Sequence, residues 1–140
     1  MARYILVALA QEIMTTETFT DLWEREGNHF KWTIEHILPQ GLGLPKEWLA
    51  MLGGADKASV IQQQHVHRLG NLTITGYNST LSNRSFQAKK IRKDSKGRFV
   101  GFKNGLALNA DVVEATQWTA AEINDRTEKL AEQVLKLFPL

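Results

Sequence analysis

Residues 32–40 read Trp-Thr-Ile-Glu-His-Ile-Leu-Pro-Gln and contain the clearest strand signal in the chain. Apolar residues alternate with polar ones over residues 30–34, which is the pattern of a β-strand with one buried face. The strand runs directly into Glu35 and His36. Pro39 then disfavours a helix and keeps the residue before it extended. We therefore expect a strand that ends in a carboxylate and an imidazole.

A second polar position stands at the start of another short strand. Residues 70–76, Gly-Asn-Leu-Thr-Ile-Thr-Gly, are β-prone and bounded by glycines,. Asn71 begins this strand, and a helix is expected from Asn78 or Ser79 to about Lys93, with Phe86 as one of its inward anchors. The order of elements around the polar residues is therefore strand, strand, helix.

The segments that flank this centre are mostly helical. Apolar residues at helical spacing predict a helix over 3–14, and further helices are expected over 45–52 and 57–67. An Asn-Gly pair within residues 99–108 favours a small hairpin. A capping box, Thr-Ala-Ala-Glu at 119–122, predicts the start of a final helix,. We expect one α+β structural domain, in which a helical lead-in of residues 1–29 packs on a core of residues 30–140.

Composition narrows the class of protein. The chain has no cysteine, which excludes disulfides and thiolate zinc sites and fits a cytoplasmic protein,. No apolar run approaches the ~20 residues that a membrane span needs, so no membrane contact is expected. Residues 84–103 carry a net charge of +7, whereas the rest of the chain carries −5. A basic segment on an acidic body favours contact with a polyanion, although a solvated surface would have the same charge.

The polar residues suit the hydrolysis of a phosphodiester. A histidine with a pKa near neutrality can take a proton from water, which is the role expected for His36. A hard divalent cation neutralises the charge that develops, and it prefers oxygen ligands. Glu35 and Asn78 are side chains of that type. An ideal strand sends neighbouring side chains to opposite faces, so a bend at residues 37–39 would be needed to bring both groups to one site.

Two motifs together resemble a known family. Residues 32–40 look like the first strand of an HNH nuclease, also called a ββα-metal or His-Me finger domain. The second motif runs from His67 through the Gly-Asn-Leu-Thr stretch to Lys89 and looks like the second strand and helix. The particular form resembles the C-terminal nuclease domain of GmrSD-type, modification-dependent (type IV) restriction enzymes. The likeness covers about residues 30–138 and implies a small ββα-metal core surrounded by helices.

The resemblance also implies roles for single residues. His36 would be the general base, and Asn71 would brace the loop that carries it. Glu35 and Asn78 would hold Mg²⁺ or Mn²⁺, with Asn83 as the alternative to Asn78 because the spacing from Asn71 is short. Contact with DNA would come from the helix and its basic end, namely Asn83, Arg84, Lys89, Lys90, Arg92 and Lys93. The implied setting is defence against modified phage DNA in the cytoplasm, with a separate NTP-hydrolysing and recognition domain or subunit.

Other interpretations of the same residues remain open. The cysteine pairs that hold a structural zinc in many HNH domains are missing, so no structural zinc is expected in this chain. His65 and His67 form an H-x-H pair near a helix end, with no third ligand nearby, and a packing or surface role is expected for them. The chain could also be a nucleic-acid-binding module without catalysis, or a domain that docks a partner protein through its aromatic residues.

Overall fold

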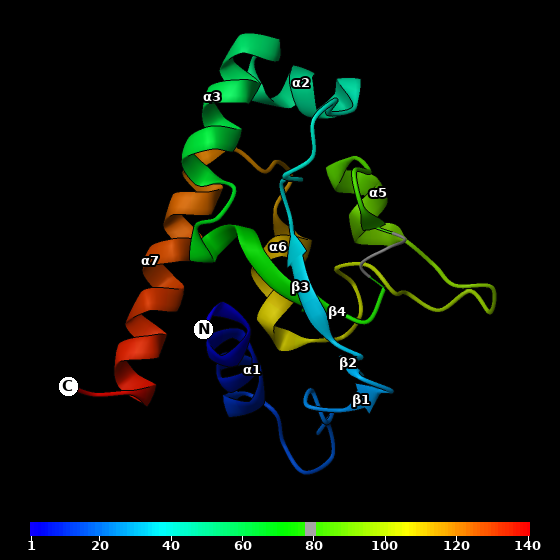
Figure 1. Cartoon of the computed structure of the whole chain (residues 1–140), viewed down its shortest axis with the longest axis vertical. Coiled ribbons are helices and arrows are strands. Elements are labelled where there is room, and N and C mark those ends of the chain that lie inside the picture. Colours follow the sequence, from blue (N-terminus) through cyan, green and yellow to red (C-terminus); the bar gives the residue numbers. More distant parts are fainter. Residues whose placement is uncertain (78–80) are drawn as a thin grey trace.

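Four short strands lie among the helices of the computed structural model, which describes residues 1–77 and 81–140. The α+β class expected from the sequence is confirmed (Figure 1). The elements are α1 (Ala2–Glu12), β1 (Arg25–Glu26), β2 (His29–Phe30), β3 (Thr33–His36), α2 (Lys46–Leu52), α3 (Ala55–His65), the 3₁₀ turn η1 (Leu69–Asn71), β4 (Leu72–Thr75), α5 (Phe86–Ile91), the 3₁₀ turn η2 (Ala107–Asn109), α6 (Ala110–Glu114) and α7 (Ala120–Leu137).

The central feature is an antiparallel pair of strands. β3 pairs with β4, so that Thr33 lies opposite Thr75 and His36 lies opposite Leu72. All four residues of β4 are buried, which suits a strand made only of leucine, isoleucine and threonine. α5 follows β4 in the sequence and reaches back to the end of β3 through Lys89. The order β3, β4, α5 is compatible with a ββα core.

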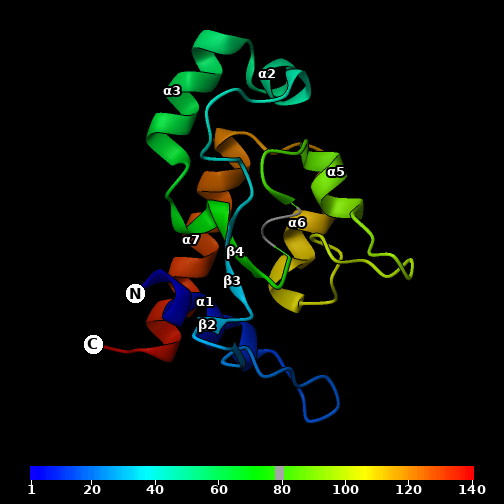
Figure 2. The same ribbon diagram turned by 45° about the vertical axis from the view of Figure 1, so that its right-hand side comes forward.

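Two clusters of buried apolar side chains flank this pair. One joins α1, β4 and α7, and it includes Leu6, Leu9, Leu72, Ile74 and Leu130. The other joins the segment after β3 to α2, α5 and the start of α7, and it includes Ile37, Leu38, Trp48, Phe86, Trp118 and Ile123. Figure 2 shows α7 running past both regions. The helix at the N-terminus thus shares a core with the strands.

The long helix α7 is fastened to the start of β4. The expected capping box is confirmed, because the Glu122 carboxylate accepts a hydrogen bond from the backbone N–H of Thr119 at 2.8 Å. Gly70 lies so close to α7 that a Cβ atom there would be 2.1 Å from the carbonyl oxygen of Ile123. Only glycine permits this approach, which sets the position of Asn71 relative to the helix.

Two predictions from the sequence are wrong. The helix expected from residue 78 or 79 to 93 is not continuous: the part that the structure describes has a turn at residues 82–85, with Ser82 at φ +34°, and α5 starts only after the N-cap Ser85. The side chain of Ser85 accepts a hydrogen bond from the N–H of Ala88, so a capping residue restarts the helix,.

The hairpin expected over residues 99–108 is absent from that fully described segment. Its second half forms the turn η2 instead, and Asn104 accepts a hydrogen bond from the N–H of Leu106. Lys93 forms a bridge with Phe99 around a turn closed by Asp94. The Asn-Gly pair therefore ends an irregular segment rather than joining two strands.

A search of the described helices finds none that is both long and apolar enough to cross a membrane.

Candidate active site

The end of β3 places Glu35 and His36 at the rim of one pocket. Glu35 is 2% exposed, whereas His36 is partly exposed. Both line a pocket of about 460 Å³, whose other lining residues are Ile34, Pro39, Gln40, Gly41, Ser82 and Asn83. The two residues therefore share a pocket although they are neighbours on a strand.

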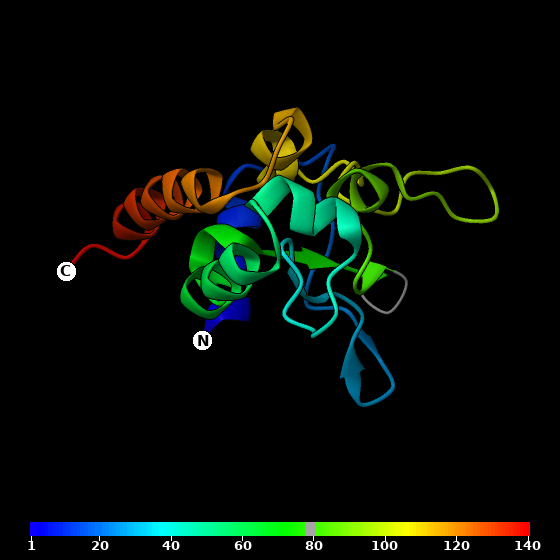
Figure 3. The same cartoon turned by 90° about the horizontal axis from the view of Figure 1, so that it is seen from above.

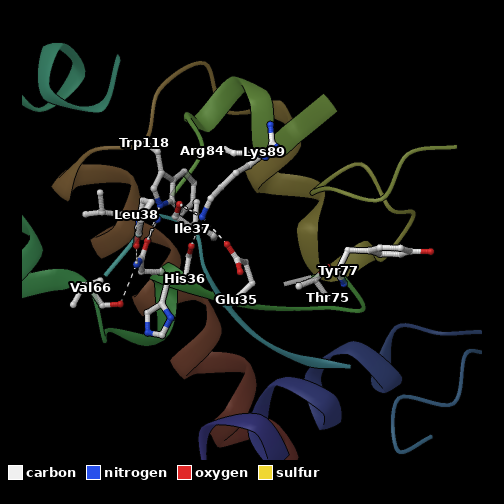
Figure 4. A network of polar contacts seen from close by, with 12 residues as sticks. Glu35, His36, Ile37, Leu38, Val66, Thr75, Tyr77, Arg84, Lys89 and Trp118 are labelled. Atoms are coloured by element: carbon white, nitrogen blue, oxygen red, sulfur yellow. Dashed lines mark hydrogen bonds and ion pairs between the residues drawn. The ribbon is translucent and has the colours of Figure 1, made fainter. Parts of the chain in front are cut away.

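Lys89 of α5 forms hydrogen bonds to the end of β3. Its ammonium donates to Glu35 Oε1 at 2.5 Å, to the carbonyl oxygen of His36 at 2.7 Å and to that of Ile37 at 3.3 Å (Figure 4). Burial raises the pKa of the Glu35 carboxyl, and Lys89 opposes that shift. Burial lowers the pKa of Lys89, and Glu35 opposes it in turn. Each buried charge depends on the other.

Asn71 ties the segment after His36 to the turn before β4. Its Oδ1 accepts hydrogen bonds from the N–H of Leu38 at 2.8 Å and from Trp118 Nε1 at 3.1 Å. Its Nδ2 donates to the carbonyl oxygens of Leu38 at 3.0 Å and Val66 at 2.9 Å. These bonds use the full capacity of a fully buried amide,. The side chain thus has the bracing geometry that the resemblance implied.

A second histidine meets His36. Nε2 of His36 lies 3.2 Å from Nδ1 of His67, and the two rings are nearly perpendicular, at 79°. Burial, followed by the nearby His67 and Lys89, lowers the pKa of His36 to about 4. The imidazole is therefore neutral at physiological pH and keeps a lone pair that can accept a proton, but its lowered pKa makes it a weaker base than the near-neutral histidine expected from the sequence,. His67 is exposed, and the sequence analysis missed its contact because only the folded chain brings positions 36 and 67 together.

Asn83 closes the opposite side of the pocket. Its amide nitrogen donates to the carbonyl oxygen of Gly43 at 3.1 Å and approaches that of Leu42 at 3.4 Å. Asn78, the ligand favoured from the sequence, lies outside the described residues. Among the residues that the structure describes, no cluster of three or more histidine, cysteine, aspartate or glutamate side chains could hold a metal ion. A cation here would depend on Glu35, amide oxygens and water, which is a donor set that suits Mg²⁺.

Two of the lysines expected at the DNA surface are buried, which corrects the sequence analysis. Lys89 has no exposed surface, and Lys90 is 7% exposed. The ammonium of Lys90 donates to the carbonyl oxygen of Ala115 at 2.6 Å, just beyond the end of α6. A signal for this was present, because Lys89 and Lys90 stand three and four residues after the inward Phe86 on one helical face.

The remaining basic residues expected to contact DNA lie nearer the surface. Arg84 and Lys93 are exposed, and Arg92 is partly exposed. The carbonyl oxygen of Arg84 accepts a hydrogen bond from Trp48 Nε1 at 2.9 Å, which holds the turn before α5 against α2. A basic surface is therefore available around α5, but not on the helix face that the sequence suggested.

The chain matches the family model for the C-terminal domain of GmrSD restriction endonucleases over residues 2–133. It belongs to this family. No curated protein and no solved structure matches the chain. The match confirms the GmrSD-type resemblance seen in the sequence, and the family name indicates a restriction endonuclease, whose substrate is DNA. In this GmrSD C-terminal domain, the pocket at the end of β3 brings an imidazole and a carboxylate together.

Proposed function

We propose that this chain is a divalent-metal-dependent endonuclease of the HNH type that hydrolyses DNA phosphodiesters. The observation that supports this most directly is the pocket lined by Glu35, His36 and Asn83 at the end of β3. The neutral imidazole of His36 takes the proton from the attacking water. Glu35 and Asn78 would hold the cation, with Asn83 as the alternative amide. A divalent cation bound there supplies positive charge to the phosphate as it gains negative charge.

The rest of the site positions these groups. Lys89 holds the Glu35 carboxylate and two carbonyl oxygens of the same strand end, so it fixes the backbone that carries His36. Asn71 fixes the next residues through both polar groups of Leu38. Because a displacement of about 1 Å at a catalytic group can cost on the order of 100-fold in rate, this rigidity serves catalysis.

Family membership supports a biological setting. We propose that the domain acts in the cytoplasm, in modification-dependent (type IV) restriction of foreign DNA such as phage DNA. The sequence contains no G-x-x-x-x-G-K-[ST] motif, so nucleotide hydrolysis and recognition are assigned to a separate domain or subunit,.

Metal dependence tests the proposed chemistry. With Mg²⁺ or Mn²⁺, the protein should nick supercoiled plasmid DNA, and EDTA should abolish the nicking. Independently of turnover, Mn²⁺ should broaden the NMR signals of His36 and Asn83 while the exposed His29 on β2 stays sharp. Equal broadening at His29, or none at His36, would remove the metal site from this pocket. DNA binding without cleavage would favour the non-catalytic module, and protein binding without DNA binding would favour the docking domain.

A protruding basic loop, residues 93–103, is the DNA-contacting surface that we propose in place of the buried lysines. Figures 1 and 3 show it extending from the end of α5, away from the body of the molecule. Asp94 Oδ1 accepts hydrogen bonds from the N–H groups of Lys96 and Arg98, which close a turn within the loop. The ammonium groups of Lys93 and Lys103 lie 4.8 and 5.5 Å from the ring centre of Phe99.

Salt dependence tests this surface. Replacing Lys93 and Lys96 with glutamine should reduce the slope of log K against log salt by about 2, because each phosphate contact contributes about 0.9. The loss should be similar for unrelated duplex sequences, since phosphate contacts do not read bases. Fluorescence anisotropy with a labelled duplex at several salt concentrations measures the slope. Replacing the exposed Lys57 on α3 and Lys136 on α7 removes the same charge elsewhere and should leave it unchanged; an equal effect would refute the assignment.

A further inference from the structure

The contact between His36 and His67 joins two segments that are far apart in the sequence. His36 ends β3, whereas His67 lies in the turn between α3 and η1. The distance of 3.2 Å between His36 Nε2 and His67 Nδ1 is that of a hydrogen bond,. The ring centres are 5.2 Å apart and the rings meet edge to face. One ring nitrogen of His36 is therefore already engaged by the protein.

Hydrogen bonds of Asn71 join the two backbone segments that carry His36 and His67. Asn71 Nδ2 donates to the carbonyl oxygen of Val66, the residue before His67. The same Nδ2 donates to the carbonyl oxygen of Leu38, two residues after His36. In addition, the N–H of Ile37 donates to the carbonyl oxygen of Asn71 at 2.9 Å. One buried asparagine thus fastens both segments that carry the histidines.

Two neutral imidazoles can place their protons in two ways that form this hydrogen bond. In the first, Nε2–H of His36 donates to Nδ1 of His67, and Nδ1 of His36 keeps a lone pair. In the second, Nδ1–H of His67 donates to Nε2 of His36, and Nδ1 of His36 carries its proton. The first arrangement places both rings in the Nε2–H tautomer, which free histidine prefers, whereas the second requires the less favoured tautomer in both.

We propose that His67 is a positioning residue that holds His36 in the Nε2–H tautomer, so that Nδ1 of His36 is the atom that accepts the proton from water. The inference rests on the proposed function, because it names the atom of the general base. The hydrogen bond at one ring nitrogen sets which form the other takes, and it also fixes the orientation of the ring. His67 does not contact the reacting atoms; it acts through His36.

A spectroscopic experiment tests the tautomer without turnover. Long-range ¹H–¹⁵N spectra of histidine-labelled protein, recorded with EDTA at pH 8, distinguish protonated from unprotonated ring nitrogens. The His36 signals are assigned by their loss in His36→Gln. We expect a single Nε2–H tautomer for His36, and averaging of its two nitrogen shifts in His67→Phe, which keeps a ring but offers no acceptor. An Nδ1–H tautomer in the wild type, or unchanged shifts in His67→Phe, would overturn the inference.

A kinetic experiment tests the consequence. His67→Phe should lower kcat by about 10- to 100-fold, the usual cost of losing a partner that orients an active-site group. KM for DNA should stay within twofold, since His67 binds no substrate. His67→Asn, whose Oδ1 is bonded to Cγ as Nδ1 of histidine is and can accept the same hydrogen bond, should recover most of kcat. His29→Gln removes an exposed imidazole on β2 and serves as the matched control.

The outcomes separate the two proposals. If His67→Phe keeps wild-type activity, the positioning role of His67 is wrong, and the general-base role of His36 is not affected. If His36→Ala keeps wild-type activity, His36 is not the general base, and the inference about His67 is wrong as well. If the isolated chain does not cleave DNA, the NMR spectra still decide the tautomer.

Discussion

Replacing His36 with alanine should lower the rate of DNA nicking by about 100- to 10,000-fold, the usual contribution of a general base. The neutral imidazole is the proton acceptor in the pocket, and alanine has none. The fold should survive, because the hydrogen bond from Lys89 reaches the backbone carbonyl of His36 and not its side chain. KM for DNA should change little, since the proposed phosphate contacts lie on the basic loop. The measurement is the time course of plasmid nicking with Mg²⁺ or Mn²⁺ under single-turnover conditions.

A matched control separates catalysis from a loss of structure. His29→Ala removes an exposed imidazole on β2 and should keep full activity. Circular dichroism and the thermal midpoint of His36→Ala should match those of the wild type. Equal nicking by the wild type and His36→Ala would contradict the proposed mechanism. If His36→Ala lost secondary structure as well as nicking, the loss of rate would be due to unfolding and not to the missing base.

The strand end and the last helix could be predicted because their signals are local. Alternation before Glu35 and the proline after it define where β3 stops, and these signals involve neighbours only. The capping box at Thr119 and Glu122 is similarly contained within one turn of helix. Asn71 was found from its place at the start of a β-prone stretch, although the sequence did not show its partners Trp118 and Val66.

The features that failed depend on distant parts of the chain. From the sequence, Lys89 and Lys90 were expected to be exposed, because lysine is rarely buried without a partner. Their partners, Glu35 and the carbonyl oxygen of Ala115, lie 54 and 25 residues away and come together only in the fold. The contact of His67 with His36 spans 31 residues. The interruption of the helix was not predicted, although Ser85, the N-cap of α5, is a residue type that favours helix starts,.

Asn71→Ala should destabilise the protein by about 3 kcal/mol or more, because each buried polar group left without a partner costs about 1–3 kcal/mol. The substitution leaves four such groups: the N–H and carbonyl oxygen of Leu38, the carbonyl oxygen of Val66 and the indole N–H of Trp118. The separate costs do not add fully, since neighbouring groups relax together. Urea denaturation followed by tryptophan fluorescence measures the free energy of unfolding.

Asn109→Ala is the comparison for burial alone. Asn109 is 1% exposed, accepts a hydrogen bond from Thr73 and donates one to Asn104 at 3.2 Å. Because the hydrogen bonds of its amide join Thr73 and Asn104 and not the segment after His36, this substitution should cost less stability than Asn71→Ala and should lower the nicking rate of the folded protein less. An equal loss of stability in the two variants would mean that the bracing bonds of Asn71 add nothing to burial.

Asn71→Asp tests the donors separately from the acceptor. The aspartate can accept from Leu38 and Trp118, but as a carboxylate it cannot donate to the carbonyl oxygens of Leu38 and Val66. Burial beside those oxygens would raise the pKa of the new carboxyl, so the stability that this variant loses relative to the wild type should be smaller at pH 4 than at pH 7, where the proton is lost. At temperatures where both Asn71 variants remain folded, their nicking rates should still fall, because the segments that carry His36 and His67 are no longer held by one amide.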